Sequence, residues 1–220
     1  MFKGLLSICL LLFYANCQFN GIDVSVWQGP NIDFQAVKNS GINFVILRAG
    51  YGRGTVDDYF EINYQKAKAA GLNVGVYWYS YAESYDDSTS EANAVLSVMK
   101  GKQFEYPIYY DIEERSIFDK GVDFTSGIAK NFCTILESNK YYCGIYASLN
   151  FLKNYFNYEV KHKYTVWVAQ YNSECTYDEP YAIWQRSSKG NVPGIDGNVD
   201  LDISYEDFPP IMKEFHLNGF

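Results

Sequence analysis

The sequence predicts a single-domain α/β protein, a barrel of five βα units followed by three strands. Over the first two thirds of the chain, short β-rich runs alternate with helical patterns, which indicates a parallel sheet with right-handed crossovers. The last third holds three more strand-like runs, and Pro and Gly break the short gaps between them. Eight strands are enough to close a barrel.

The expected strands are short, apolar and rich in Val, Ile and Tyr, as in sheets that are covered on both faces. They are Gly21–Val26, Phe44–Ala49, Val74–Ser80, Ile108–Ile112, Gly144–Ala147, Tyr164–Ala169, Ala182–Gln185 and Val199–Ile203. The expected helices lie between the first five strands and after the fifth, at residues 33–39, 60–70, 88–100, 125–138 and 149–155.

Two similar junctions support the βα units. Gly41 and Gly71 each follow a helical pattern and precede a strand-like run. Glycine just past a helix adopts the left-handed capping conformation, and a step of about thirty residues is the length of one βα unit. A full (β/α)8 barrel takes about 250 residues, so missing helices explain how this shorter chain suffices. An open doubly wound sheet is the alternative, but no glycine-rich nucleotide motif follows the first strand.

Residues 1–17 have the features of a secretory signal peptide. Lys3 precedes an apolar run over residues 5–14, and Ala15-Asn16-Cys17 forms a cleavage site. The run is too short for a membrane-spanning helix. We therefore expect residues 18–220 to be secreted, or delivered to a lysosome, phagosome or digestive vacuole. A buried first helix is the alternative interpretation.

Cleavage would leave Cys133, Cys143 and Cys175, which in an oxidising compartment fit one disulfide and one free thiol. The sequence does not choose the pair, although Cys133–Cys143 is the most local. Neither the cysteines nor His162 and His216 have metal-ligand spacing, so we expect no metal and no Ser–His or Cys–His nucleophile.

The composition favours a carbohydrate site. The chain has 18 basic and 26 acidic residues, a formal charge of −8 and 18% aromatic residues. Nucleic acids and anionic membranes need clustered Lys and Arg, so neither is an expected partner. Sugar rings stack on aromatic faces, and carboxyl groups cut glycosidic bonds. We expect a monomer without a cofactor.

A carboxylate pair stands at the end of the fourth strand, where the chemistry of parallel α/β folds is found. Asp111 and Glu113 are two residues apart, so on a strand they would share a face, and Glu114 would point away. Two close carboxyls repel, so one of them keeps its proton to higher pH. That proton donor is what a glycosidic leaving group needs.

The first and last strands add Asp23 and Asp200. These strands are neighbours in a closed barrel, so both side chains would face the same mouth as the Asp-x-Glu pair. Asp196 and Asp202 lie close enough in sequence to leave the choice of Asp200 open. Solvated charges in turns are the alternative interpretation of these carboxylates.

Aromatic and amide side chains gather at the same strand ends. For any one aromatic residue, core packing is the simpler interpretation, but together they form stacking walls for sugar rings, with glutamines bonding the hydroxyls. The substrate-binding candidates are Tyr51, Tyr79, Trp167, Gln170, Tyr171, Trp184 and Gln185.

Six motifs, in family order and spanning nearly the whole mature chain, resemble glycoside hydrolase family 25, the Chalaropsis-type lysozymes. They are Gly-Ile-Asp-Val-Ser-Val-Trp-Gln from Gly21, Phe-Val-Ile-Leu-Arg-Ala-Gly from Phe44, Tyr-Asp-Ile-Glu from Tyr110, Trp-Val-Ala-Gln-Tyr from Trp167, Ile-Trp-Gln from Ile183 and Val-Asp-Leu-Asp from Val199. The resemblance implies an irregular, TIM-like (β/α)5β3 barrel. It also implies hydrolysis of the β-1,4 bond between N-acetylmuramic acid and N-acetylglucosamine in bacterial peptidoglycan.

By the same resemblance, Glu113 is the general acid and later base, Asp111 is its partner, and Asp23 and Asp200 complete the site. Two mechanisms stay open. Asp111 attacks the anomeric carbon, or the substrate's own 2-acetamido oxygen attacks while Asp111 orients it. We favour the second, because side chains two apart on one strand lie too close to straddle the scissile bond.

Two rival functions remain. A chitinase of the Asp-x-x-Asp-x-Asp-x-Glu type would need Asp where Tyr106 and Tyr109 stand. A catalytically silent carbohydrate-binding barrel is the rival from another class, and the presence of all four carboxylates argues against it.

Overall fold

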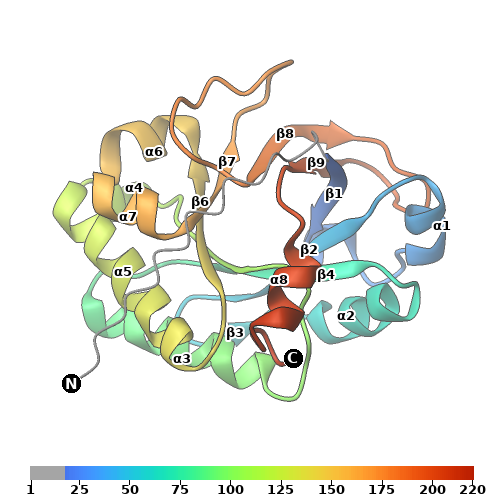
Figure 1. Ribbon diagram of the computed structural model, residues 1–220, viewed down its shortest axis with the longest axis horizontal. Coiled ribbons are helices and arrows are strands. Elements are labelled where there is room, and N and C mark those ends of the chain that lie inside the picture. The colour runs from blue at the N-terminus through green and yellow to red at the C-terminus, as the bar shows by residue number, and fades with distance from the viewer. Residues whose placement is uncertain (1–17) are drawn as a thin grey trace.

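The expected barrel is present in the computed structural model, which describes residues 18–220 (Figure 1). The strands are β1 (Phe19–Val24), β2 (Phe44–Tyr51), β3 (Thr55–Val56), β4 (Asn73–Tyr79), β5 (Ile108–Asp111), β6 (Cys143–Ser148), β7 (Thr165–Ala169), β8 (Ile183–Gly190) and β9 (Val199–Ser204). The helices are α1 (Phe34–Asn39), α2 (Phe60–Ala69), α3 (Tyr85–Met99), α4 (Arg115–Phe118), α5 (Val122–Ser138), α6 (Leu149–Tyr155), α7 (Tyr158–Lys163) and α8 (Phe208–Glu214), with a 3-10 turn at Val26–Gln28.

Eight of these strands close into a barrel. Their order is β1-β2-β4-β5-β6-β7-β8-β9, and β1 pairs with both β2 and β9, which joins the two ends of the sheet. The two-residue β3 only extends the edge of β2. The expected fold class is confirmed, and the open doubly wound sheet is wrong. The expected signal peptide, residues 1–17, lies outside the described residues. Within residues 18–220, no helix is long and apolar enough to cross a membrane.

Strand direction sets which residues meet at each end of the barrel. β1 runs parallel to β2, and the parallel arrangement continues through β8, but β9 is antiparallel to both of its neighbours. The beginning of β9 therefore lies beside the ends of the other strands. Asp200, the second residue of β9, pairs with Asp23 near the end of β1. We call this end of the barrel the mouth and the opposite end the floor.

Local signals explain several helix boundaries. Gly41 and Gly71 follow α1 and α2 with φ of 95° and 74°, the left-handed conformation that the sequence predicts. Ser84 caps α3 by accepting a hydrogen bond from the Asp87 backbone N–H at 3.1 Å. Such caps satisfy backbone donors that a helix start leaves unpaired.

The barrel has an inner and an outer apolar layer because side chains alternate along each strand. On β2, Val45 and Leu47 belong to the layer between barrel and helices, whereas Phe44 and Ile46 point inward. Figure 1 shows α1 and α2 on one side of the barrel and α4 to α7 on the other, with α8 near the C-terminus. Phe208 on α8 packs its ring edge-on against Tyr106 at the floor, with 5.2 Å between ring centres.

We call the side chains that fill the floor the floor cluster. Its members are Phe44, Ile46, Tyr106, Tyr109, Phe208 and Met212. Glycines on neighbouring strands make room for these rings, since a Cβ on Gly21 would lie 2.1 Å from the Phe44 ring. The floor was not expected to carry a helix, and α8 is a feature that sequence analysis missed.

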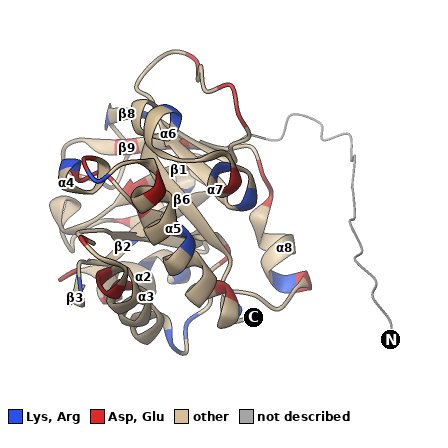
Figure 2. Cartoon of the chain, turned by 90° about the vertical axis from the view of Figure 1, so that its left-hand side faces the viewer, with Lys and Arg blue, Asp and Glu red and all other residues tan. Residues whose placement is uncertain are grey.

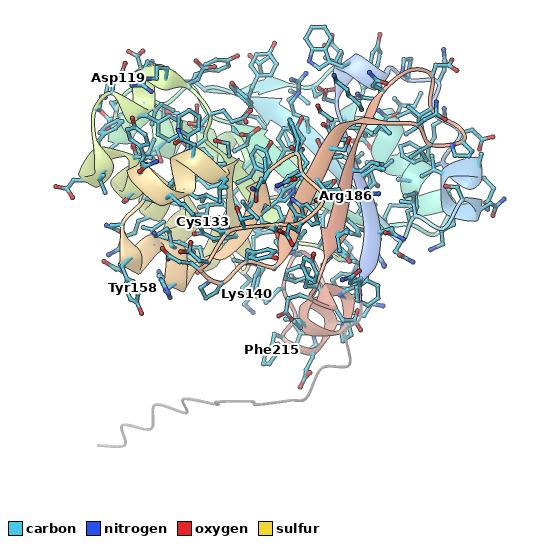
Figure 3. The ribbon with its side chains drawn as sticks, turned by 90° about the horizontal axis from the view of Figure 1, so that it is seen from above. Asp119, Cys133, Lys140, Tyr158, Arg186 and Phe215 are labelled. Carbon is cyan, nitrogen blue, oxygen red and sulfur yellow. A yellow bond between two sulfur atoms is a disulfide. The ribbon has the colours of Figure 1, made fainter. Side chains whose placement is uncertain are left out.

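The helical shell is also tied to the barrel by a disulfide. Cys133 on α5 is bonded to Cys143 at the start of β6 (Figure 3), the most local of the three possible pairs. Cys175 is free. Figure 2 shows Lys and Arg interspersed with Asp and Glu on α5 and α7, where Lys130 pairs with Glu159 at 2.6 Å. Exposed pairs of this kind contribute about 0–1 kcal/mol each, so the apolar layers hold the shell in place.

Candidate active site

A cavity of about 240 Å³ opens at the mouth of the barrel. All eight barrel strands, or the loops that follow them, contribute side chains to it. The lining residues are Asp23, Ser25, Trp27, Gln28, Arg48, Tyr77, Tyr79, Asp111, Glu113, Tyr146, Trp167, Tyr171, Gln185 and Asp200. We call it the mouth cavity.

The four carboxylates singled out in the sequence all line the mouth cavity. β5 ends at Asp111, so Glu113 lies in the loop beyond it. The backbone N–H of Ile112 donates to the carbonyl of Tyr146 at 3.0 Å, which holds this loop against β6. Asp111 is 3% exposed, and its Oδ1 has no hydrogen-bond donor among the described residues.

Burial and mutual repulsion raise the pKa values of the carboxyl groups in the mouth cavity. The pKa of Glu113 is raised, first by burial and then by the charges of Asp200 and Glu114. The pKa of Asp111 is raised well above its usual range by burial and by Glu113, while Arg48 opposes the shift. Burial raises the pKa of Asp200 to about 6. Proton-holding carboxyls therefore stand at this mouth at mildly acidic pH.

Glu114 does not point away from the site, contrary to the sequence-based expectation. Strand alternation ends with β5 at Asp111, so it no longer decides where Glu114 lies. The phenol of Tyr79 donates a hydrogen bond to Glu114 Oε1 at 2.7 Å. Glu114 therefore fixes one wall of the mouth cavity and also adds its charge near Glu113.

Gln185 connects several groups of the site. Its Nε2 donates to Asp23 Oδ2 at 2.7 Å, and its Oε1 accepts from the phenols of Tyr146 and Tyr171 at 2.9 and 3.1 Å. Because a carboxylate only accepts hydrogen bonds, the amide nitrogen must face Asp23. This arrangement ties two phenols to one amide oxygen.

Tyr79, Trp167, Tyr171 and Gln185 line the mouth cavity, as the sequence predicts for sugar-binding candidates. Tyr51 does not line it. The shift in the pairing of β2 with β4 between Arg48 and Gly50 sets Tyr51 beside Tyr79, and the Arg48 guanidinium lies 5.5 Å from the centre of the Tyr51 ring. Tyr51 therefore contacts a lining residue, and its part in sugar binding stays a prediction.

Trp184 and Gln170 also lie outside the lining. Trp184 precedes the inward-facing Gln185 on β8, so it points the other way, and its indole N–H donates to the Gln170 carbonyl at 2.8 Å. The Gln170 side chain is bonded to Thr176, at 2.9 Å through Nε2 and 2.7 Å through Oε1. These two residues shape the loop that carries Tyr171 rather than the cavity itself.

The structure adds lining residues that sequence analysis did not select. Arg48 continues the inward series of β2, and its Nε pairs with Asp57 at 2.8 Å. Tyr146 on β6 is two residues beyond Gly144 on the same face, a signal that alternation would have supplied. Trp27, 84% exposed, stands in the 3-10 turn after β1, which Ser25 caps.

A barrel with paired, proton-holding carboxyls and exposed aromatic rings at its mouth is the architecture of a glycoside hydrolase. Comparison with known proteins places the chain within that class. The profile of the Glycosyl hydrolases family 25 matches residues 22–195. The chain belongs to this family, as its motifs indicate.

The autolytic lysozyme of Clostridium acetobutylicum is 33% identical over 183 residues, which cover 83% of this chain and 54% of that protein. The chain thus spans about half the length of that relative. Among solved structures, the CTP1L endolysin superimposes with a TM-score of 0.78 and 27% identity, over 89% of this chain and 70% of that one. The bacterial lysozyme of Streptomyces coelicolor gives a TM-score of 0.73 and 25% identity, over 86% and 92%.

Proposed function

We propose that the protein is a secreted or vesicular lysozyme that hydrolyses the β-1,4 bond between N-acetylmuramic acid and N-acetylglucosamine in bacterial peptidoglycan. The observation that carries this proposal is the convergence of Glu113 and Asp111 in the mouth cavity, with both pKa values raised. Family membership and the lysozyme relatives support peptidoglycan as the substrate. The signal-like residues 1–17 support export.

Glu113 acts first as the general acid. It must hold a proton when the substrate is bound, and in the empty cavity it competes with Asp111 for that proton. The free Oδ1 of Asp111 offers an acceptor for the N–H of the substrate's 2-acetamido group. That hydrogen bond stabilises ionised Asp111, whose negative charge then keeps the proton on Glu113. Substrate binding therefore leaves the proton on Glu113, the residue that donates it to the leaving group.

The reaction then proceeds by substrate assistance. The acetamido carbonyl oxygen attacks the anomeric carbon as Glu113 passes its proton to the leaving sugar oxygen and the glycosidic bond breaks. Glu113, now ionised, removes a proton from water, and the water oxygen opens the cyclic intermediate. Asp23 and Asp200 place carboxyl oxygens near the developing positive charge of the sugar ring, and each adds negative charge only in its ionised fraction. Two displacements retain the anomeric configuration.

Exposed rings at the cavity rim are suited to sugar binding. Trp27 is 84% exposed and Tyr171 is 59% exposed, and both line the mouth cavity. Aromatic faces in this position stack on pyranose rings, and the phenol of Tyr171 is already oriented by Gln185. The wall polymer is the proposed partner.

The test is incubation of the purified protein with a defined peptidoglycan and, separately, with chitin, followed by mass analysis of the fragments. We expect fragments with N-acetylmuramic acid at the reducing end and no cleavage of chitin. Fragments ending in N-acetylglucosamine, or cleavage of chitin alone, would reject the proposed bond. Binding without new reducing ends would identify a silent carbohydrate-binding barrel.

The route through the acetamido group has its own test. Proton NMR of the first product should show the β-anomer, and release of the α-anomer would mean a single displacement by water. Substrates that lack the 2-acetamido carbonyl should not turn over. If they do, Asp111 is the nucleophile.

A further inference from the structure

Asp202 is a fifth carboxyl group beside the site, and the proposed reaction does not use it. It lies on β9 two residues after Asp200, opposite Gly21 of β1 and Gln185 of β8. Its side chain is 1% exposed and does not line the mouth cavity. Its Oδ1 accepts a hydrogen bond from the indole Nε1 of Trp167 at 2.9 Å.

The other oxygen of Asp202 is unsatisfied. Oδ2 is buried and has no donor among residues 18–220. The Asp202 carboxyl lies within hydrogen-bonding reach of the Asp23 carboxyl, which already accepts from Gln185 at 2.7 Å. Two ionised carboxyls cannot bond each other, because each offers only acceptors. A single proton between them would supply the missing donor and remove one buried charge.

We propose that Asp202 is a positioning residue that shares one proton with Asp23 and thereby fixes the Asp23 carboxyl at the mouth of the barrel. The indole of Trp167 donates to Asp202, and the shared proton joins Asp202 to Asp23. Gln185 donates to Asp23 from the other side. Each buried oxygen of Asp202 then has a partner. The inference rests on the proposed function only in treating Asp23 as part of the hydrolytic site.

Charged and titratable groups from several strands act on this pair. The negative charge of Asp200 on β9 raises the pKa of both carboxyls. The positive charge of the exposed Arg186 on β8 (Figure 3) acts in the opposite direction on the pKa of Asp202. The phenols that face the pair are Tyr77 from β4, Tyr109 from β5, Tyr146 from β6 and Tyr171 from the loop after β7.

Burial changes the pKa values of Asp23 and Asp202 more than any of these neighbouring groups does. It raises the pKa of Asp202 to about 8 and the pKa of Asp23 well above its usual range. The folded protein therefore keeps the shared proton at neutral pH, whereas the unfolded chain releases it near pH 4. The pair's contribution to stability is greatest at low pH and declines as pH rises toward the folded pKa.

The first test counts this proton with Asp202→Asn. The amide keeps an oxygen for Trp167 and offers an N–H to Asp23, but it does not titrate. Between about pH 5 and pH 7, each rise of one pH unit should increase the unfolding equilibrium constant of the wild type by about tenfold more than that of the variant. Asp196→Asn, at an exposed position in the loop before β9, is the matched control and should follow the wild type.

Equal pH slopes for the wild type and Asp202→Asn would overturn the shared proton. If Asp202→Asn does not fold, Asp23→Asn gives the same test, since it removes the other half of the pair. Neither measurement needs a substrate. Failure of the inference is therefore distinguishable from failure of the proposed lysozyme activity.

The second test addresses positioning. Asp202→Leu has similar size but can neither accept from Trp167 nor bond Asp23. On a neutral oligosaccharide, kcat of Asp202→Asn should be about tenfold or more above that of Asp202→Leu, with KM changed much less. Equal kcat values for the two variants would show that Asp202 does not act through a hydrogen bond to Asp23.

Discussion

The floor and the mouth of the barrel interior are built by the same strands but differ in chemistry. Along β2 the inward side chains change from Phe44 and Ile46 at the floor to Arg48 at the mouth. Along β5 they change from Tyr109 to Asp111. The floor cluster is apolar and is closed by α8, whereas the mouth gathers carboxyls whose burial raises their pKa values.

The floor of the barrel therefore serves mainly the stability of the fold, and the mouth serves its function. Burying apolar rings at the floor stabilises the fold. Burying carboxyls at the mouth costs free energy, which the rest of the structure must offset. Substitutions at the floor should therefore change stability with little effect on turnover, and substitutions at the mouth should do the reverse.

Glu113→Gln is expected to give the largest effect. The amide keeps the size of the side chain but cannot donate the proton, so kcat should fall about 10²–10⁴-fold. Stability near neutral pH should be unchanged or higher, because the buried ionisable group is gone. Initial rates on a neutral oligosaccharide and thermal unfolding measure the two quantities.

Glu214→Gln is the control for this prediction, because Glu214 is exposed at the end of α8. It should leave both rate and stability unchanged. If Glu113→Gln retains more than about a tenth of the wild-type rate, Glu113 is not the general acid.

Phe208→Ala tests the floor. Phe208 is 1% exposed and packs on Tyr106, so its truncation should cost about 3–5 kcal/mol of unfolding free energy. Turnover of the folded fraction should not change, since the site lies at the other end of the barrel. Denaturant unfolding and rates measured well below the melting temperature check this prediction.

Phe215→Ala is the matched control, since Phe215 follows α8 but is 63% exposed. It should change stability by less than about 0.5 kcal/mol. A kcat that falls in parallel with stability in Phe208→Ala would show that floor and mouth are coupled.

Local patterns explain why most of this barrel could be predicted from sequence. All eight barrel strands and five helices were expected close to where they lie, because strand composition and the capping glycines Gly41 and Gly71 act over short distances. The reversal of β9 was not expected. It depends on the connection from β8 rather than on the composition of either strand. The helix α8 was missed, although its buried Phe208 and Met212 close the floor.

The site residues could be predicted where the order of the strands determines their position. Asp23, Asp111 and Glu113 meet because the carboxyl ends of parallel strands converge. Tyr51 does not line the cavity, and the shift in strand pairing beside it is a tertiary feature with no local signal here, so its part in sugar binding stays a prediction. The partners of Asp202 come from β1 and β7, so its burial and its contacts required the closed barrel.

Glu114→Gln should have a smaller effect, limited to the pH dependence of the reaction rate. The amide oxygen still accepts from Tyr79, so the wall keeps its shape, but the charge near Glu113 is lost. The pKa of Glu113 then falls, and the basic limb of the pH–rate profile should move to lower pH by less than about one unit. Glu114→Asp, which keeps the charge, should leave the limb nearer its wild-type position, and an unmoved limb in Glu114→Gln would contradict this electrostatic coupling.

The last prediction separates the buried charge of the mouth from the charge of the surface. Glu113 must be protonated to act, and its raised pKa means that activity should fall only as pH passes above that raised value, so the optimum is mildly acidic. The chain also carries a formal charge of −8 at pH 7, with a pI of about 4.8, and should be repelled by a wall rich in carboxylate and phosphate. Salt screens surface charges over about 8–10 Å but affects buried groups much less. Added salt should therefore restore part of the activity on whole walls at neutral pH and hardly change the profile on a small neutral oligosaccharide. An optimum at or above about pH 7.5 on the neutral substrate would show that burial does not hold the proton on Glu113.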